Sequence, residues 1–519
     1  MSGCGEGRDQ PQNSGSNQPG DFEKMAEALS LAASGGWFGN DGSWSTFLVQ
    51  VGTPPQTFNV LPATQAQNIW LPISDECVRL QGGSASCGSS RGASPFQQSP
   101  SPGFQANMSS TWEAIGLYEL GMGRIHGITG NGLHGFDSVA LYNFTLEHLA
   151  VTAYASPGFW IGQMGLSPLS LNFSETISSP SLISALKDDG HIPSLTYGYQ
   201  AGAPYRKTKI AASLVLGGYD LARASEPLTI DINTDMSRAL TVGLQDIIVT
   251  DSLNGTLSLV DNERILAPID SSIPEIWLPK SVCDRFESVF GLEYHERSGR
   301  YVLRDSARDR LRGLNPTLTF TIGTNAFTGG NTTLIQIPYA AFDLQAGYPI
   351  FANATNYFPI RRADNESQYA IGRAFLQEAY IGVDFENGIF NVSAARWDDG
   401  EADIVTIPAA DRDSEVARGQ GISGGAIAGI VVGCVAAIVL CILCAWVFVW
   451  KPRRMRKQST VLVEEKGAHD APDPAPELTS VTFHELPAKH GDSELEDIVT
   501  VPELGREEHV HELHPDCVR

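Results

Sequence analysis

The sequence has little charge, and most of the charge it has is acidic. Only 18% of its 519 residues are charged, and 35 Lys and Arg stand against 59 Asp and Glu, which gives a formal net charge of −24. Nucleic-acid binding needs a basic face that attracts phosphate groups. The composition therefore argues against a nucleic acid as partner.

Cysteine is also scarce, and no Cys/His spacing is typical of a zinc site. We predict no metal and no cofactor. Cys77 and Cys87 lie close together in a Gly/Ser-rich stretch, and we expect them to form a disulfide, as in an oxidising compartment. The alternative is that both stay unpaired. Cys283 has no obvious partner among the residues before the apolar segment described next, except Cys4.

Residues 419–450 contain no charged side chain, and residues 426–450 are almost wholly apolar. About 20 such residues span a bilayer core, so we predict a single transmembrane helix at 424–450. Five cations follow in "KPRRMRK" (451–457), which places the C-terminal side in the cytosol. All the Asn-x-Ser/Thr sequons precede the helix, as expected for a glycosylated extracellular or lumenal domain. They lie at Asn107, Asn143, Asn172, Asn254, Asn331, Asn353, Asn365 and Asn391.

Segments at both ends of the chain have no apolar pattern of a folded domain. Residues 1–36 have no apolar run of signal-peptide length. We prefer a misassigned start over translocation directed by the lone helix. We expect residues 1–36 to be disordered, 399–423 to be a polar linker and 451–519 to be a disordered cytosolic tail with unknown partners.

The tail holds six of the 11 histidines, but their spacing is too irregular to favour a metal site. Gly425, Gly429 and Gly433 make a helix-mediated homodimer conceivable.

Between these segments, short strand-like runs alternate with turn signals, and 52 Gly and 30 Pro favour many turns. We predict an all-β fold with few helices, divided into lobes at 37–222 and 223–398. Two short helices are expected, in "SPSLISALKDDG" (179–190) and "LPKSVCDRFESVFG" (278–291). The second would place Val282, Phe286 and Phe290 on one face.

The stretch "WSTFLVQVGTPPQTFNVLPATQAQNIWLP" (44–72) predicts a strand, a tight turn and a second strand. It resembles the first active-site segment of pepsin-like aspartic endopeptidases, of the membrane-anchored fungal type. Further stretches resemble that family's landmarks in order: "GFDSVAL" (135–141), "IGQMGLSP" (161–168), "ASLVLGGYD" (212–220), "LAPIDSSIPEIWLPKSV" (266–282) and "YAIGRAFLQEAYIGVDFENGIFNVS" (369–393).

The resemblance implies a bilobal fold in which each lobe supplies one catalytic aspartate to a cleft. Asp270 takes the second position, but Ala63 stands at the first. The glycine beside each aspartate is replaced by Gln65 and Ser272, and the flap tyrosine position falls on Ile125 or His126.

Two features of the family's loops are retained. Thr64 and Ser271 keep the hydroxyls that cross-link the two active-site loops in the family, and Trp70 and Trp277, expected to pack in the core, follow the loops at equivalent places.

These features favour a catalytically impaired peptidase domain whose cleft binds a peptide or protein. Asp270 would then be a loop residue with a hydrogen-bonded carboxylate, or keep a catalytic or ligand-binding role. The alternative is an active aspartic endopeptidase that cleaves proteins at acidic pH, at the cell surface or in the secretory or vacuolar pathway. A third hypothesis is an adaptor whose tail recruits cytosolic proteins.

Overall fold

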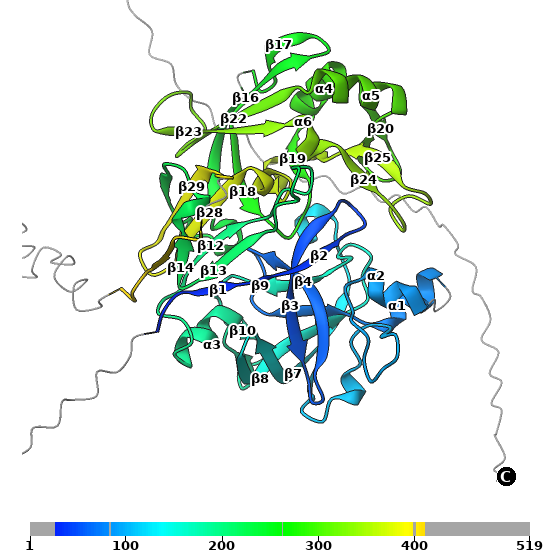
Figure 1. Cartoon of the computed structure of the whole chain (residues 1–519), viewed down its shortest axis with the longest axis vertical. Helices are drawn as coiled ribbons and strands as arrows, with labels where there is room; N and C mark the ends of the chain where they lie inside the picture. The colour runs from blue at the N-terminus through cyan, green and yellow to red at the C-terminus, as the bar shows by residue number, and fades with distance from the viewer. Residues whose placement is uncertain (1–25, 82–84, 262, 398–400, 411–519) are drawn as a thin grey trace, which may run out of the picture. The chain divides into compact units, whose positions relative to one another are not determined.

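The computed structural model describes residues 26–81, 85–261, 263–397 and 401–410. Strands dominate these ranges and form two lobes joined by a shared sheet, which confirms the predicted all-β bilobal fold (Figure 1). The predicted transmembrane helix at 424–450 and the tail at 451–519 lie outside the described residues. Within the described ranges, no helix is both long enough and apolar enough to cross a bilayer.

The first lobe is built on an eight-stranded sheet with the order β2-β3-β4-β9-β5-β8-β7-β6. The turn predicted at "GTPPQ" joins β3 to β4, which pair antiparallel from Val51 opposite Gln56. The strands are β2 (Ala33–Phe38), β3 (Trp44–Val51), β4 (Gln56–Ala63), β5 (Ile69–Pro72), β6 (Glu113–Glu119), β7 (Asn131–Leu141), β8 (Phe144–Tyr154) and β9 (Gly162–Gly165).

The second lobe has a main sheet with the order β23-β22-β16-β18-β27, with β17 paired to β16, and two smaller sheets. The main strands are β16 (Thr241–Ser252), β17 (Gly255–Ser258), β18 (Ile265–Asp270), β22 (Thr317–Gly323), β23 (Thr332–Pro338) and β27 (Ile371–Gly372). The smaller sheets contain β20 (Glu293–His295), β21 (Arg300–Val302), β24 (Leu344–Ala346) and β25 (Thr355–Phe358), and the pair β19 (Ile276–Pro279) and β26 (Ile360–Ala363).

A six-stranded sheet with the order β1-β13-β12-β28-β29-β15 contains strands from both halves of the chain, and it lies between the lobes in Figure 1. Its central pairing joins β12 of the first half to β28 of the second, with Thr196 opposite Asp384. The strands are β1 (Leu29–Leu31), β12 (Thr196–Gln200), β13 (Ser213–Leu216), β15 (Leu228–Asp231), β28 (Ala379–Asp384) and β29 (Ile389–Ala394).

Two predicted boundaries are wrong. Residues 29–36 are not disordered, because Leu29 and Leu31 are buried and pair β1 with β13. Part of the predicted linker 399–423 is also ordered, since β30 (Ile404–Thr406) pairs with β14 (Gly218–Asp220). Both strands have only three residues, too few to show a period within a polar segment.

Helices are short, and the two predicted ones are confirmed as α3 (Leu182–Asp188) and α4 (Lys280–Phe290). Val282, Phe286 and Phe290 are buried together on one face of α4, as the sequence predicted. The remaining helical segments are α1 (Ser74–Gln81), α2 (Ala85–Ser90), α5 (Asp305–Leu314), α6 (Tyr339–Phe342) and the 3₁₀ turns η1 (Ala106–Met108), η2 (Arg124–His126), η3 (Leu221–Arg223), η4 (Met236–Arg238), η5 (Glu366–Gln368) and η6 (Phe375–Gln377).

The predicted disulfide is present and joins Cys77 on α1 to Cys87 on α2. Both cysteines are buried, and they close a loop with a sequence separation of 10 residues. Among the described residues, Cys283 is a free, buried thiol on α4. Burial raises the pKa of this thiol to about 12, so it stays protonated at neutral pH.

We expect Cys77→Ser combined with Cys87→Ser to lower the free energy of unfolding by about 2–3 kcal/mol, because the unfolded chain regains the entropy of an open loop. Urea unfolding followed by tryptophan fluorescence measures the loss. A reducing agent should shift the wild-type midpoint to that of the double variant and leave the variant unchanged. Equal stability of the two proteins would contradict the prediction.

Candidate active site

Ala63 and Asp270 occupy equivalent positions in the two lobes. Ala63 ends β4, and it lies opposite Gly165 in the parallel neighbour β9. Asp270 ends β18, and it lies opposite Gly372 in the parallel neighbour β27. Each is followed, six residues later, by a strand of sequence Ile-Trp-Leu-Pro, β5 in the first lobe and β19 in the second. The fold therefore sets Ala63 at the place where the first lobe would present an acid matching Asp270.

The two opposing glycines are required by close backbone approach. A Cβ at Gly165 would come within 2.6 Å of the backbone of the loop after Ala63, and one at Gly372 would lie 2.2 Å from the carbonyl oxygen of Glu275. Only glycine lets the backbones pass at these distances. The loop architecture is thus retained in both lobes.

Thr64 and Ser271 join the two loops by reciprocal hydrogen bonds. The Thr64 amide donates to Ser271 Oγ at 3.0 Å, and the Ser271 amide donates to Thr64 Oγ1 at 3.1 Å. Each hydroxyl then donates to a carbonyl oxygen of the opposite loop, Thr64 to Ile269 at 3.3 Å and Ser271 to Pro62 at 2.8 Å. These four bonds hold the first residues of both loops in one buried unit.

Asp270 is 6% exposed, and the nearest groups bound to it come from its own loop. The amide of Ser272 donates to Oδ1 of Asp270 at 2.9 Å, and the Ser272 hydroxyl donates to the same oxygen. In the described part of the chain, no other side chain is hydrogen-bonded or ion-paired to Asp270. Asp270 therefore accepts hydrogen bonds from Ser272, but the described residues supply no second carboxylate with which it could share a proton.

The β6–β7 hairpin closes over this position and contacts the second lobe. His126, in η2 at the hairpin tip, donates from Nε2 to the carbonyl oxygen of Gln368 at 3.1 Å. The Gln368 side chain donates in return to the carbonyl oxygen of Ile125 at 2.8 Å, and the His126 ring packs on Trp277 with centroids 4.7 Å apart. Of the two residues predicted at the flap position, His126 is buried in the cleft and Ile125 is 47% exposed.

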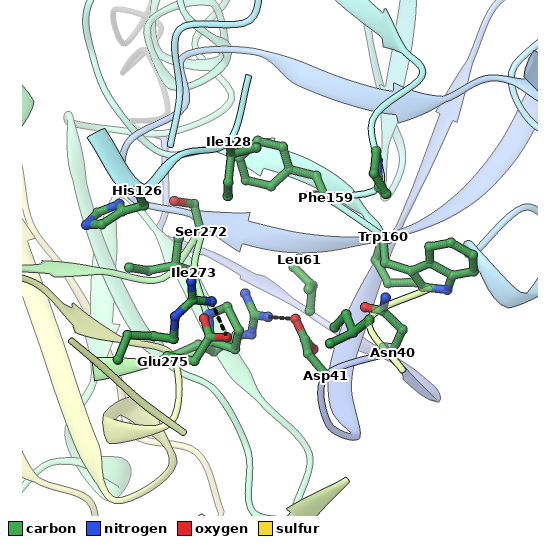
Figure 2. Close-up of a pocket in the computed structure, with 18 of the residues that line it drawn as sticks. Asn40, Asp41, Leu61, His126, Ile128, Phe159, Trp160, Ser272, Ile273 and Glu275 are labelled. Atoms are coloured by element: carbon green, nitrogen blue, oxygen red, sulfur yellow. Dashed lines mark ion pairs between the residues drawn. The ribbon is translucent and has the colours of Figure 1, made fainter. Parts of the chain in front are cut away.

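His126 separates two cavities in the cleft. The first, of about 360 Å³, is lined by Leu61, His126, Ile128, Phe159, Ser272 and Glu275 among others (Figure 2). The second, of about 320 Å³, is lined by Gln65, Trp70, His126, Met236 and Asp270 among others. His126 lines both cavities and is bonded to Gln368 of the second lobe, so the hairpin tip lies between them in the closed cleft.

A model of the eukaryotic aspartyl protease family matches residues 46–395, well over half of the chain. The chain belongs to the eukaryotic aspartyl protease family. A comparison with curated protein sequences gives no match. Membership of the aspartyl protease family accounts for the paired loops and for the hairpin over the cleft. Within the described ranges, no group of three or more His, Cys, Asp and Glu side chains is placed to hold a metal ion.

Two features of this aspartyl protease domain were missed by sequence reasoning. One is the His126–Gln368 contact, which joins segments more than 240 residues apart. The other is a buried ionic cluster at the first cavity, in which Arg300 lies 2.8 Å from Glu275 and Arg373 lies 3.8 Å from Asp41. These residues come from separate elements, and no spacing in the sequence signals their convergence.

We expect Thr64→Val to lower the free energy of unfolding by about 2–3 kcal/mol, because the buried Ser271 amide loses its acceptor while the side-chain volume stays the same. Urea unfolding of the full-length protein measures the loss. Thr319→Val, at a half-buried position on β22, is the matched control and should change stability by less than about 0.5 kcal/mol. A loss at Thr64 no larger than the control would show that the cross-link contributes nothing.

The closed hairpin should loosen as the pH falls. Burial lowers the pKa of His126, the charges of Asp270 and Glu275 and the bond to Gln368 partly oppose this, and Arg361 adds to it. Since the His126 pKa is lower in the closed state than its usual ~6.5 in water, protonation favours the open state. The stability of the closed state is complete above pH ~6.5 and is lost as the pH falls through lower values.

Hydrogen exchange of residues 120–130, corrected for the intrinsic rate, measures this opening at pH 7.5 and 5.5. We expect about threefold to tenfold less protection at the lower pH. His126→Asn can still donate to the Gln368 carbonyl but does not titrate, so its protection should be the same at both pH values. Equal protection in the wild type would overturn the prediction.

Proposed function

We propose that this protein is a membrane-anchored, glycosylated aspartyl protease homologue whose cleft binds an extended peptide or protein segment without hydrolysing it. The observation that carries the proposal is Ala63, which takes the place of the first catalytic aspartate opposite Asp270. The cross-linked loops and the hairpin over the cleft support retention of a peptide-binding scaffold.

The chemistry of amide hydrolysis in this family depends on two carboxylates that share a proton. One accepts a proton from the attacking water while the other polarises the scissile carbonyl. With Ala63, the methyl group offers neither a base nor a donor, and the lone Asp270 is already bound by Ser272. Removing one member of a unit that acts together costs on the order of 10⁴–10⁶ in turnover.

Membrane anchoring rests on the apolar segment 424–450 and the cations that follow it. The proposed orientation puts the folded domain outside the cytosol. The disulfide supports this placement, because such bonds persist in oxidising compartments. Seven of the eight sequon asparagines are exposed, and Asn391 is half-buried on β29 with its Oδ1 accepting from Thr229.

The second candidate is an active endopeptidase at acidic pH, which the position of Asp270 favours. Its carboxylate lines the second cavity and keeps its place at the end of β18. His126 is a poor substitute for the missing acid, because burial lowers the pKa of its imidazole and the charge of Asp270 opposes this only in part.

Peptide cleavage by the full-length glycosylated protein between pH 3 and 6 tests the proposal. We expect no turnover above background and no effect of a transition-state mimic of the family. Asp270→Asn is the matched variant and should show the same background cleavage as the wild type. The triple variant Ala63→Asp, Gln65→Gly, Ser272→Gly restores the second carboxylate and is expected to gain turnover that the mimic blocks.

Wild-type turnover that the mimic blocks, and that Asp270→Asn abolishes, would overturn the proposal and establish the second candidate.

A further inference from the structure

One wall of the first cavity is made of buried charges of both signs, with cations in excess. Arg300, Arg361 and Arg373 line it together with Asp41 and Glu275. Three guanidinium groups against two carboxylates leave one uncompensated positive charge in a chain that is otherwise strongly acidic. An uncompensated buried charge is costly, so this wall favours an anionic ligand.

Two of the three arginines are each held in place by a close contact with the protein. Arg300 pairs with Glu275 at 2.8 Å. Arg373 donates to the carbonyl oxygen of Ser271 at 2.6 Å, lies 3.8 Å from Asp41 and stacks over Trp44. These two residues therefore act as parts of the scaffold behind the active-site loop.

Arg361, the third arginine, makes the weakest polar contacts with the protein. Its guanidinium stacks over Trp277 at 4.6 Å from the ring centroid, and its one ion pair is a long contact of 3.6 Å with Glu275, which Arg300 already occupies. Among the described residues, no hydrogen bond is made by the Arg361 side chain. A guanidinium has five N–H donors in a fork that matches a carboxylate. Stacking on Trp277 holds that fork in place while leaving its edges open.

Other donors in the same wall also lack acceptors. Arg300 Nε, Arg373 Nε and Trp277 Nε1 are buried without a hydrogen-bond partner in the described part of the chain. Burial lowers the pKa of Arg361 and the charge of Arg300 adds to this, while Glu275 opposes it. Burial also raises the pKa of Asp41, and the charge of Arg373 opposes this. The excess of donors and positive charge calls for a ligand with acceptor oxygens.

The opposite wall is apolar, with Leu61, Ile128, Phe159 and Trp160 facing the cavity (Figure 2). Ser272, next to Asp270, lines the same space, so the cavity adjoins the line that a peptide would follow through the cleft. The cavity can therefore take an acidic side chain with its methylene groups against the apolar wall and its oxygens against Arg361. A single negative charge matches the single excess cation.

We propose that this cavity binds a carboxylate of the peptide, held by Arg361 on its Trp277 platform, so that the protein selects acidic peptides. This inference rests on the proposed peptide-binding function and names its ligand class. The carboxylate belongs to an Asp or Glu side chain or to a free C-terminus.

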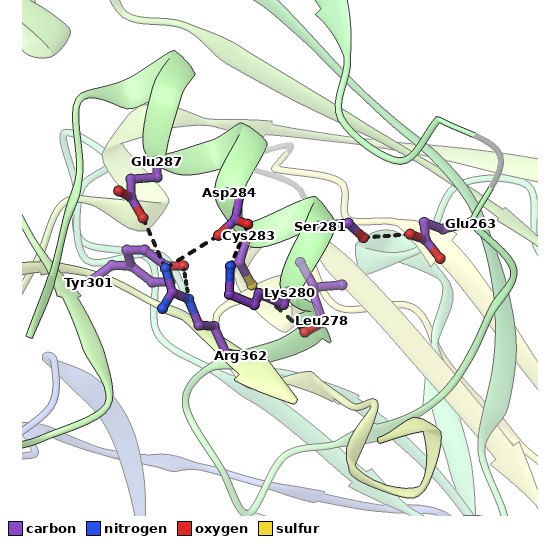
Figure 3. Close-up of polar contacts among 9 residues, drawn as sticks. All are labelled: Glu263, Leu278, Lys280, Ser281, Cys283, Asp284, Glu287, Tyr301 and Arg362. Carbon is purple, nitrogen blue, oxygen red and sulfur yellow. Dashed lines mark hydrogen bonds and ion pairs between the residues drawn. The ribbon is translucent and has the colours of Figure 1, made fainter. Parts of the chain in front are cut away.

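The neighbouring residue provides a matched control. Arg362 follows Arg361 on β26, and its side chain points to α4, where it pairs with Glu287 at 3.1 Å and Asp284 at 3.3 Å and donates to Tyr301 at 2.7 Å (Figure 3). Arg362→Met therefore removes a cation from the same strand without touching the cavity. Arg361→Met leaves Glu275 paired with Arg300, so the fold does not lose its buried ion pair.

Retention of peptide pools by the immobilised full-length protein at pH 7 tests the proposal. The pools are random decapeptides, acetylated and amidated, with a central Glu in one and a central Gln in the other. A third pool has the central Gln and a free C-terminal carboxylate. We expect the Glu pool to be retained about tenfold better than the Gln pool, as for a charge-assisted bidentate contact. Arg361→Met should abolish the difference, Arg361→Lys should keep part of it, and Arg362→Met should leave it intact.

Retention of the third pool like that of the Glu pool would identify the C-terminus as a further source of the carboxylate, in support of the proposal. Equal retention of the Glu and Gln pools by the wild type would overturn the inference and leave peptide binding standing. Undiminished preference in Arg361→Met would overturn it as well. Failure to retain any pool would overturn both the inference and the proposed function. Should Arg361→Met not fold, the wild-type comparison of the first two pools decides alone.

Discussion

The whole arrangement depends on one buried contact, the reciprocal bonding of the Thr64 and Ser271 hydroxyls to the backbone of the opposite loop. A buried amide without an acceptor is costly, so each loop can adopt its conformation only in the presence of the other. The cleft, the cavities beside it and the position of Asp270 all follow from that mutual requirement. The contact uses hydroxyls and backbone alone, which is why it survives when Ala63 removes an acid one residue away. The contact that joins the loops is therefore independent of the side chain at position 63.

The scaffold was accessible to sequence reasoning because it depends on short-range patterns. Alternating strands, the turn at "GTPPQ", the apolar face of α4 and the disulfide are each contained within a few residues. The equivalence of Ala63 and Asp270 can also be predicted from the sequence, since each lies six residues before an Ile-Trp-Leu-Pro strand. The edge strand β1 was missed because two leucines in a polar segment give no usable period.

The site's long-range contacts could not be predicted in the same way. His126 was one of two candidates for the flap position, but its partner Gln368 lies on η5 of the other lobe, and only the folded chain brings them together. The arginines behind the cleft come from β21, β26 and the loop after β27, with partners in the loop before β3 and the loop after β18. On a strand whose residues alternate between core and solvent, the sequence pattern alone predicts that a charged residue faces the solvent. Arg361 and Arg362 show the difficulty, because adjacent arginines point to opposite sides of β26 and serve different surroundings.

The sheet shared by the two lobes has a consequence for how the protein is made. Strand β12 is synthesised about 180 residues before its neighbour β28, so during translation one edge of β12 stays unpaired. Such long-range pairings form slowly and leave the nascent chain prone to aggregation. The first lobe cannot complete its hydrogen bonding until the second has emerged from the ribosome. The shared sheet is therefore completed only after nearly all of the folded domain has been synthesised.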